Sequence, residues 1–67
     1  MDNDRPIVFT VTEITNNFGG LYRIYTKDSR YEYNQSDISV LRLFETMVEI
    51  ADDVNISKGY IVLFEVD

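Results

Sequence analysis

The sequence contains no cysteine, no histidine and no tryptophan, and its 67 residues include one proline and three glycines. The absence of cysteine excludes disulfides, thiolate nucleophiles and cysteine-based zinc sites. The absence of histidine removes the usual general base near neutral pH and the commonest metal ligand. A chain this short buries only about 60% of the surface that its unfolded form exposes, which leaves little room for a deep substrate cavity. The composition therefore predicts one small domain, residues 1–67, that is not an enzyme and uses no metal or other cofactor.

Basic residues are also scarce, because six Lys and Arg stand against twelve Asp and Glu, for a net charge of −6. Nucleic acids and anionic membranes are bound chiefly through Lys and Arg, so we expect neither to be a direct partner. Apolar residues make up 45% of the chain and aromatic residues 13%, enough for a packed core. The sequence thus predicts a folded acidic domain that prefers a basic partner.

No segment has the composition of a targeting signal or a membrane span. Asp2 and Asp4 lie where a signal peptide carries Lys or Arg, and the uninterrupted apolar runs are only a few residues long. We therefore expect a cytoplasmic protein in which residues 1–6 form a short flexible lead-in.

Two strands joined by a turn are predicted at the start of the domain. Residues 7–15 are nearly all β-branched or aromatic, which favours a strand. The Asn and Gly residues at 16–20 tolerate positive φ, so the chain reverses there and returns as a strand over 21–26. Residues 31–33 are either a short third strand or the end of the second strand after a bulge. The face of the first strand that we expect to be buried consists of Ile7, Phe9 and Val11.

A helix is predicted from about Asp37 to Asp53. Ser36 is a good N-cap, and the carboxylate of Asp37 complements the positive end of the helix dipole. Apolar residues recur at helical spacing along one arc, which we expect to pack on the sheet. That arc holds Val40, Leu41, Phe44, Met47, Val48 and Ala51.

Residues 60–66 are apolar at nearly every position, which predicts an inner strand covered on one side by the helix. The order of elements is strand, strand, short strand, helix, strand. This order indicates an α+β fold, in which an antiparallel sheet made of a hairpin or meander and a final strand carries one helix on one face.

The negative charge is concentrated in the second half of the chain. Up to Ser36 there are five acids and four bases, a net of −1, whereas the rest has seven acids and two bases, a net of −5. Carboxylates at helical spacing repel one another, and in the last turn they oppose the helix dipole. Such a row imitates the charges of a nucleic-acid backbone; the alternative is a solvated face that keeps a small protein soluble. The row consists of Glu45, Glu49, Asp52 and Asp53.

Some apolar positions of the predicted helix fall outside its main arc. Three of them widen the arc beyond what one sheet face normally covers, which indicates a homodimer seam or a contact with a partner or, alternatively, a core under a curled sheet. These are Leu43, Ile50 and Val54. Ile38 falls near the acidic side of the predicted first turn, where it is either an exposed anchor for a partner or an ordinary exposed apolar residue.

Tyrosines and basic residues between the second strand and the helix are a further candidate site, because aromatic rings beside cations stack on single-stranded bases. Interleaved acids oppose this interpretation, and ordinary cross-strand pairing of tyrosines is the alternative that we prefer. The residues concerned are Arg23, Tyr25, Lys27, Arg30, Tyr31 and Tyr33.

Two short segments resemble the small dimeric uracil-DNA glycosylase inhibitors of phages of Gram-positive bacteria. Residues 31–33, Tyr-Glu-Tyr, are similar to a strand end of that family, and residues 36–41, Ser-Asp-Ile-Ser-Val-Leu, to its Ser-Asp-Phe-Glu-Val-Leu helix start. The resemblance implies a homodimeric DNA mimic that occupies the DNA-binding groove of the enzyme and captures an apolar side chain there. For individual residues, the resemblance implies that Glu32 and Asp37 are acidic contacts. It also extends to Ile38, which occupies the position of the Phe in the family's helix start.

Together these features predict a non-catalytic phage inhibitor that binds a basic, nucleic-acid-binding host enzyme, with uracil-DNA glycosylase as the first candidate. Small acidic phage proteins that act on RNA polymerase or on CRISPR effectors are similar in size, so those enzymes are alternative targets. A small dimeric adaptor module, whose acids serve only solubility, is an alternative of another class. The acids expected to face the partner are Glu32, Asp37, Glu45, Glu49, Asp52 and Asp53.

Overall fold

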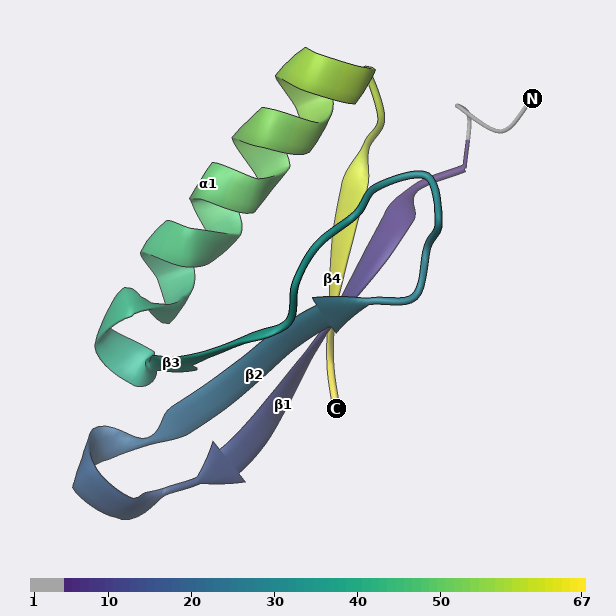
Figure 1. The fold of residues 1–67 in the computed structure, drawn as a ribbon. Helices are drawn as coiled ribbons and strands as arrows, with labels where there is room; N and C mark the ends of the chain where they lie inside the picture. Colours follow the sequence, from purple (N-terminus) through teal and green to yellow (C-terminus); the bar gives the residue numbers. More distant parts are fainter. Residues whose placement is uncertain (1–4) are drawn as a thin grey trace.

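Four strands form one sheet, and a single helix crosses one face of it (Figure 1). The computed structural model describes residues 5–67, so most of the predicted lead-in, residues 1–4, lies outside the described residues. The arrangement confirms the α+β class with one helix packed on a sheet. The elements are β1 (Ile7–Thr15), a short 3-10 helix η2 (Asn17–Gly19), β2 (Leu21–Thr26), β3 (Ser36–Ser39), α1 (Val40–Lys58) and β4 (Val62–Val66). The strand order is β3-β2-β1-β4.

The first hairpin has the predicted bounds. β1 and β2 pair antiparallel with Val11 opposite Ile24, and the register shifts between Glu13 and Thr15. Gly19 and Gly20 adopt φ of 88° and 98°, a backbone conformation that residues with a Cβ rarely adopt. The Asn and Gly residues therefore form the reversal expected of them.

The third strand is Ser36–Ser39, and the prediction of a strand at residues 31–33 is wrong. β3 pairs antiparallel with β2, with Asp37 opposite Arg23. The Tyr31 and Tyr33 rings instead pack edge-on against Phe9, at centroid distances of 6.0 and 5.4 Å. Packing of these two partly buried rings against Phe9 holds their segment over the core rather than in the strand ladder.

The helix begins and ends later than the sequence predicts. Ser39, not Ser36, is at its N-cap, and the last residue is Lys58 rather than Asp53. Gly59 ends the helix in the left-handed conformation, with φ 74°, and its N–H donates to the Asn55 carbonyl at 3.0 Å. A glycine at this position and a lysine in the last turn are both typical of helix C-termini.

The last strand lies at the edge of the sheet and runs parallel to β1, so the predictions of an inner strand and an antiparallel sheet are wrong at this point. Helix α1 carries the chain back across the sheet to the end where β1 begins, and a strand entered from there must run in the direction of β1. The sheet is therefore mixed. Figure 1 shows α1 and β4 close together at the top and diverging toward the bottom.

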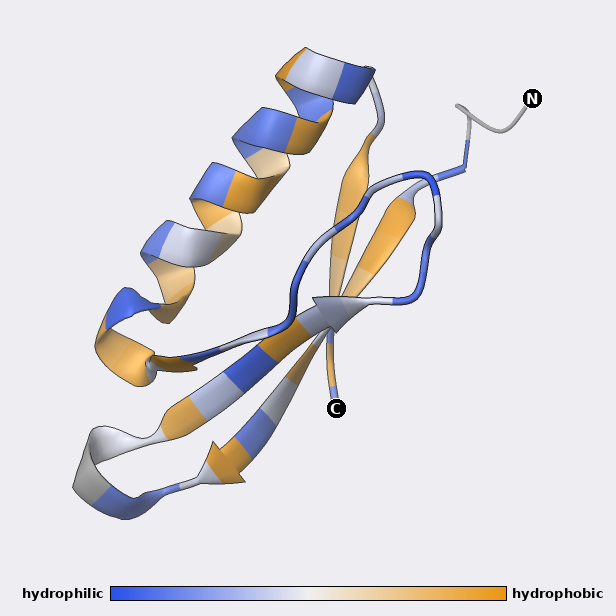
Figure 2. Cartoon of the chain, in the orientation of Figure 1, coloured by the Kyte–Doolittle hydropathy of each residue, from blue (hydrophilic) through white to orange (hydrophobic). Residues whose placement is uncertain are grey.

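The core lies between the sheet, the helix and the β2–β3 connection. Its buried members are Ile7, Phe9, Val11, Ile24, Ile50 and Val54. The predicted inward face of the first strand is thus confirmed, and Figure 2 shows the apolar residues of β1 and β4 side by side. Among the described residues, no helix has the length and apolar composition needed to cross a membrane.

The helix packs through a face that only partly overlaps the predicted one, since Met47 of the predicted arc packs against the core. Ile50 and Val54 are buried and Leu43 packs against the core, whereas Leu41 and Phe44 are 91% and 77% exposed. The two ends of the helix explain this rotation. β3 leads into α1 without a loop, the Val40 N–H donates to the Gly20 carbonyl at 3.2 Å, and Asp53 accepts a bond from Tyr31. These contacts fix the rotation of the helix, so that the half of its broad apolar arc with Ile50 and Val54 is buried and the half with Leu41 and Phe44 is exposed.

Candidate functional site

Three carboxylates form a row along the side of α1 that points away from the sheet: Glu45, Glu49 and Asp52. We call these three the acidic row. At about 1.5 Å of rise per residue, successive members lie about 6 and 4.5 Å apart along the helix axis. All three are exposed, and none has a hydrogen bond or ion pair with any residue from 5 to 67. The row therefore makes no ion pair among the described residues, and the exposed Arg42, three residues before Glu45, is the cation that lies beside it on the helix.

The acidic row is followed, one turn further on, by an exposed apolar side chain. Ile56 comes four residues after Asp52, so the two lie on the same side of the helix. It is 84% exposed. Because the predicted helix ended at Asp53, this position was missed from the sequence.

Asp53 belongs to a contact with the β2–β3 connection rather than to the acidic row. Its carboxylate accepts a hydrogen bond from the Tyr31 hydroxyl and another from Ser57 Oγ at 3.3 Å. The bond to Asp53 raises the pKa of Tyr31 to about 12, because ionisation would remove the donor and place two negative charges together. Asp53 thus anchors the helix to the connection.

Asp37 lies on the other face of the sheet from the helix. Ile24 points into the core, so its neighbour Arg23 and the residue opposite, Asp37, point away. The Arg23 guanidinium donates to both carboxylate oxygens of Asp37, at 2.8 and 3.1 Å. This pairing lowers the pKa of Asp37 and raises that of Arg23. Asp37 is therefore neutralised and is not part of the acidic row.

Glu32 is also separate from the acidic row. It is an exposed residue of the β2–β3 connection, between Tyr31 and Tyr33, whose rings contact Phe9. The structure thus brings together three of the six predicted acids, Glu45, Glu49 and Asp52, and places Glu32, Asp37 and Asp53 in other surroundings.

The predicted apolar anchor and dimer seam are corrected by the structure. Ile38 pairs with Tyr22 in the β3–β2 ladder and packs against the core, so it does not protrude as an anchor. The predicted seam lies on the core side of the helix, as the alternative interpretation held. It consists of Leu43, Ile50 and Val54.

The exposed apolar residues of α1 form a second surface that the sequence analysis assigned to the core. We call Leu41, Phe44 and Val48 the apolar flank. They follow one another at spacings of three and four residues, so they lie on one side of the helix. The arc that contains them was visible in the sequence; its exposure was not, because it depends on the rotation of the helix.

The candidate basic aromatic patch is not assembled by its two arginines. Arg23 is paired with Asp37, and Arg30 donates to Asp28, with Nη2 to Oδ2 at 2.6 Å, and lies 4.9 Å from the centre of the Tyr60 ring. The bonds from Arg30 lower the pKa of Asp28 to about 2. Because both arginines are occupied within the fold, they are not free to hold phosphates.

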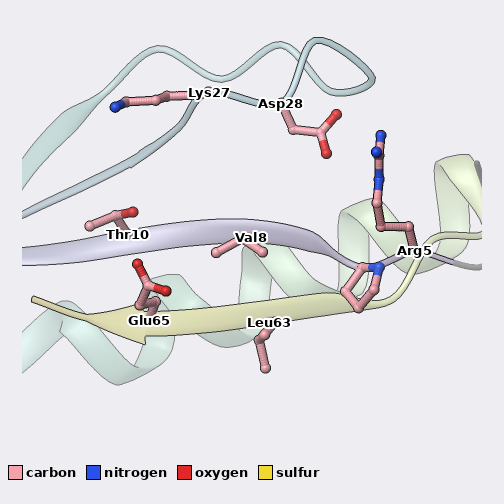
Figure 3. A pocket seen from close by; sticks show the side chains of 8 residues that line it. Arg5, Val8, Thr10, Lys27, Asp28, Leu63 and Glu65 are labelled. Carbon is pink, nitrogen blue, oxygen red and sulfur yellow. The ribbon is translucent and has the colours of Figure 1, made fainter.

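An open pocket of about 500 Å³ lies on the sheet face opposite the helix (Figure 3). Val8 and Leu63, adjacent in the parallel β1–β4 ladder, form its apolar floor. Arg5 and Lys27 rise from different sides of it, and Glu65 projects beside Thr10. Charges of both signs line the pocket, so it has no clear preference for an anion or a cation.

The chemistry available at these surfaces is recognition by charge and apolar contact. Within residues 5–67 there is no group of three or more carboxylate, histidine or cysteine side chains placed to hold a metal ion. Comparison with protein-family models, with curated proteins and with solved structures gives no match, so conclusions about function rest on the residues of this chain.

Proposed function

We propose that the protein is a non-catalytic inhibitor that occupies the nucleic-acid-binding groove of a DNA-handling enzyme. The observation that carries the proposal is the acidic row, Glu45, Glu49 and Asp52, which is exposed and forms no ion pair among the described residues. Placing like charges in a row costs stability, and binding a basic groove gives that arrangement a use. Uracil-DNA glycosylase is the first enzyme to test, because of the sequence resemblance.

The proposed mechanism has two parts. The acidic row steers the protein toward a groove lined with Lys and Arg, which raises the association rate more than the affinity. Ile56, in line with the row, then takes the role of apolar anchor that the sequence analysis gave to Ile38. Burial of an isoleucine contributes about 1.5–3 kcal/mol, so this contact slows dissociation.

Reversing one charge of the acidic row tests the proposal. Glu49→Lys should weaken inhibition of uracil excision by a uracil-DNA glycosylase at least tenfold, because it replaces attraction with repulsion at the centre of the contact. Glu13→Lys is the matched control, since Glu13 is also exposed and the same change in net charge occurs on β1, away from α1. Inhibition and protein stability are measured for both variants at the same ionic strength.

Two results would contradict this mechanism. Equal loss of inhibition in Glu49→Lys and Glu13→Lys would mean that net charge, not the acidic row, is responsible. Inhibition that is unchanged in about 0.5 M NaCl would exclude electrostatic mimicry, since charges on an open surface are screened there within about 4 Å. If the protein does not inhibit uracil-DNA glycosylase, the same pair of variants is tested for inhibition of RNA polymerase and of CRISPR effectors.

The apolar flank favours a second candidate function, a small adaptor module. Large apolar side chains such as Leu41 and Phe44 are rarely left in contact with water on one side of a helix unless they meet a partner. An adaptor would keep its partner in Glu49→Lys and lose it in Phe44→Asp. The inhibitor proposed above would instead lose its target enzyme in Glu49→Lys and keep it in Phe44→Asp.

A further inference from the structure

The outer edge of β4 presents unpaired backbone groups. The Ile7 N–H donates to the Ile61 carbonyl at 2.8 Å, and the Asp67 N–H donates to the Val11 carbonyl at 2.9 Å. Because these groups alternate in direction along a strand, residues of odd number in β4 direct theirs toward β1. The residues that direct their N–H and C=O groups away from the sheet are Val62, Phe64 and Val66. Within residues 5–67 no strand pairs with this edge.

Exposed apolar side chains lie beside this edge on both faces of the sheet. Leu63 is 54% exposed on the face opposite the helix, and Val66 is 77% exposed on the helix face. The helix leaves Val66 uncovered, in keeping with the divergence of α1 and β4 in Figure 1. β4 also contains no lysine, proline or bulge, the features by which proteins protect an edge strand. An apolar edge of this kind is a template for an added strand.

Glu65 gives this edge a preference for positive charge. Its side chain shares a face with Leu63, and its neighbour in β1 is the uncharged Thr10. The Glu65 carboxylate is exposed and makes no hydrogen bond or ion pair with any described residue. A strand added at the edge would bring a side chain opposite it, with the two Cβ atoms about 4.5–5.5 Å apart. A lysine or arginine there would pair with Glu65, whereas an acidic residue would be repelled.

The other charges near β4 do not oppose a basic strand. Lys27 follows β2, so β1 lies between it and the edge. Arg5 precedes β1, whose first residue pairs with Val62, and so it lies toward the start of β4 rather than beside Glu65. A second copy of β4 does not supply the cation, because residues 60–67 contain two acids and no lysine or arginine. The charge at this edge therefore favours a segment of a different protein.

We propose that this edge binds an extended segment of another protein, which adds a strand to the sheet and carries a lysine or arginine opposite Glu65. The added strand runs antiparallel to β4, the slightly more stable pairing. It exchanges backbone hydrogen bonds with Val62, Phe64 and Val66 and places an apolar residue opposite Leu63. This function goes beyond occupation of a nucleic-acid-binding groove, because it uses no residue of the acidic row.

A synthetic peptide with these features tests the proposal. Acetyl-Thr-Val-Arg-Val-Leu-Val-Thr-amide places its arginine opposite Glu65 and its leucine opposite Leu63 when it pairs antiparallel with β4. The N–H groups of Phe64 and Val66 point to solvent in the free protein, so their hydrogen exchange should be fast. Saturating peptide should slow this exchange about tenfold or more, because it supplies carbonyl acceptors for both groups. Amide NMR of the full chain measures the exchange, and chemical-shift titration gives the dissociation constant.

Two N-methylated forms of this peptide test the backbone pairing. An N-methyl group on the central valine, opposite Phe64, removes an N–H that points to β4 and should raise the dissociation constant about tenfold. An N-methyl group on the leucine, opposite Leu63, lies on the outer side of the added strand and should have little effect. The two peptides have the same side chains, so binding through side chains alone would affect them equally.

Exchange of charge tests the role of Glu65. A peptide with glutamate in place of arginine should bind the wild type about fivefold more weakly at low ionic strength. Glu65→Arg should reverse this order, so that the glutamate peptide becomes the tighter of the two. Glu49→Lys is the matched control, since it reverses a charge on the helix and should leave the order as in the wild type. Circular dichroism verifies that both variants are folded.

The proposal is overturned if about 1 mM arginine peptide leaves the exchange of Phe64 and Val66 unchanged, or if the two N-methylated peptides bind equally. It is also overturned if Glu65→Arg ranks the arginine and glutamate peptides as the wild type does. Slow exchange of both amides in the protein alone would overturn it too, because a second copy would then cover the edge. Glu49→Lys should bind the peptide like the wild type whether or not it loses an enzyme target, which separates this proposal from the inhibitor proposal.

Discussion

Individual side chains hold the β2–β3 connection in place although it has no regular secondary structure. The Arg30 guanidinium donates to the carbonyls of Arg5 and Pro6, at 2.9 and 3.1 Å, as well as to Asp28. The next residue, Tyr31, bonds to Asp53 of the helix and packs on Phe9. One arginine and one tyrosine thus connect this segment to the start of β1, to α1 and to the core.

Tyr31→Phe should lower the free energy of unfolding by about 0.5–1.5 kcal/mol at neutral pH, because it removes one hydrogen bond and little apolar area. The bond stabilises the fold fully below pH 10, and its contribution is lost as the pH rises through the folded-state value of about 12. The difference between wild type and variant should therefore shrink between pH 10 and 12. Urea unfolding across this range measures it.

Tyr25→Phe is the control for this experiment. The Tyr25 hydroxyl has no hydrogen bond with any other described residue, so the variant should differ little from wild type at any pH. A constant difference between Tyr31→Phe and wild type up to pH 12 would show that the hydroxyl of Tyr31 does not contribute through its bond to Asp53.

At the scale of elements, the sequence predicts the existence of α1 but not its rotation or its ends. The spacing of apolar residues identifies a helix, yet Leu43 and Phe44 are equally apolar and only one of them faces the sheet. Which half of the arc is buried depends on contacts with distant residues, Gly20 and Tyr31. For the same reason the acidic row could be predicted, whereas the removal of Asp53 from it could not.

The end of the helix depends on one glycine. Gly59→Ala should cost about 1 kcal/mol, since φ of 74° strains a residue with a Cβ while an added Cβ would meet nothing within 4 Å. Gly59→Asn should cost less, because asparagine tolerates the left-handed conformation. Thermal unfolding of the two variants compares these costs, and equal losses would mean that side-chain volume, not backbone strain, limits this position.

At the scale of the whole molecule, the first hairpin and the α+β class follow from local patterns, and the direction of β4 does not. An apolar run such as Val62–Val66 suits a parallel or an antiparallel neighbour equally well. The choice is made by where α1 delivers the chain. Edge position is likewise a property of the assembled sheet, and this is why β4 was predicted to be an inner strand.

Salt should act in opposite directions on the fold and on binding to a basic enzyme. The Debye length falls from about 30 Å at 0.01 M to about 8 Å at 0.15 M, and the radius of gyration of 12.3 Å lies between these values. Repulsion among acids across the molecule is therefore felt only at low salt. The melting temperature should rise by a few degrees over this range while affinity for a basic target falls; thermal scans and titrations measure the two effects. A melting temperature that falls would show that ion pairs such as Arg23 with Asp37 dominate.

The parallel pairing of β1 with β4 also affects how the protein reaches its native state. Ile7 pairs with Val62, so β1 obtains this neighbour only after β2, β3, α1 and β4 have been synthesised. Closing so long a segment costs entropy before any contact offsets it, which makes the hairpin the faster step and docking of β4 the slower one. Until that docking, β1 exposes an edge rich in β-branched residues. Aggregation during synthesis is therefore a competitor of folding at this edge, and a chaperone that binds extended apolar segments would act there.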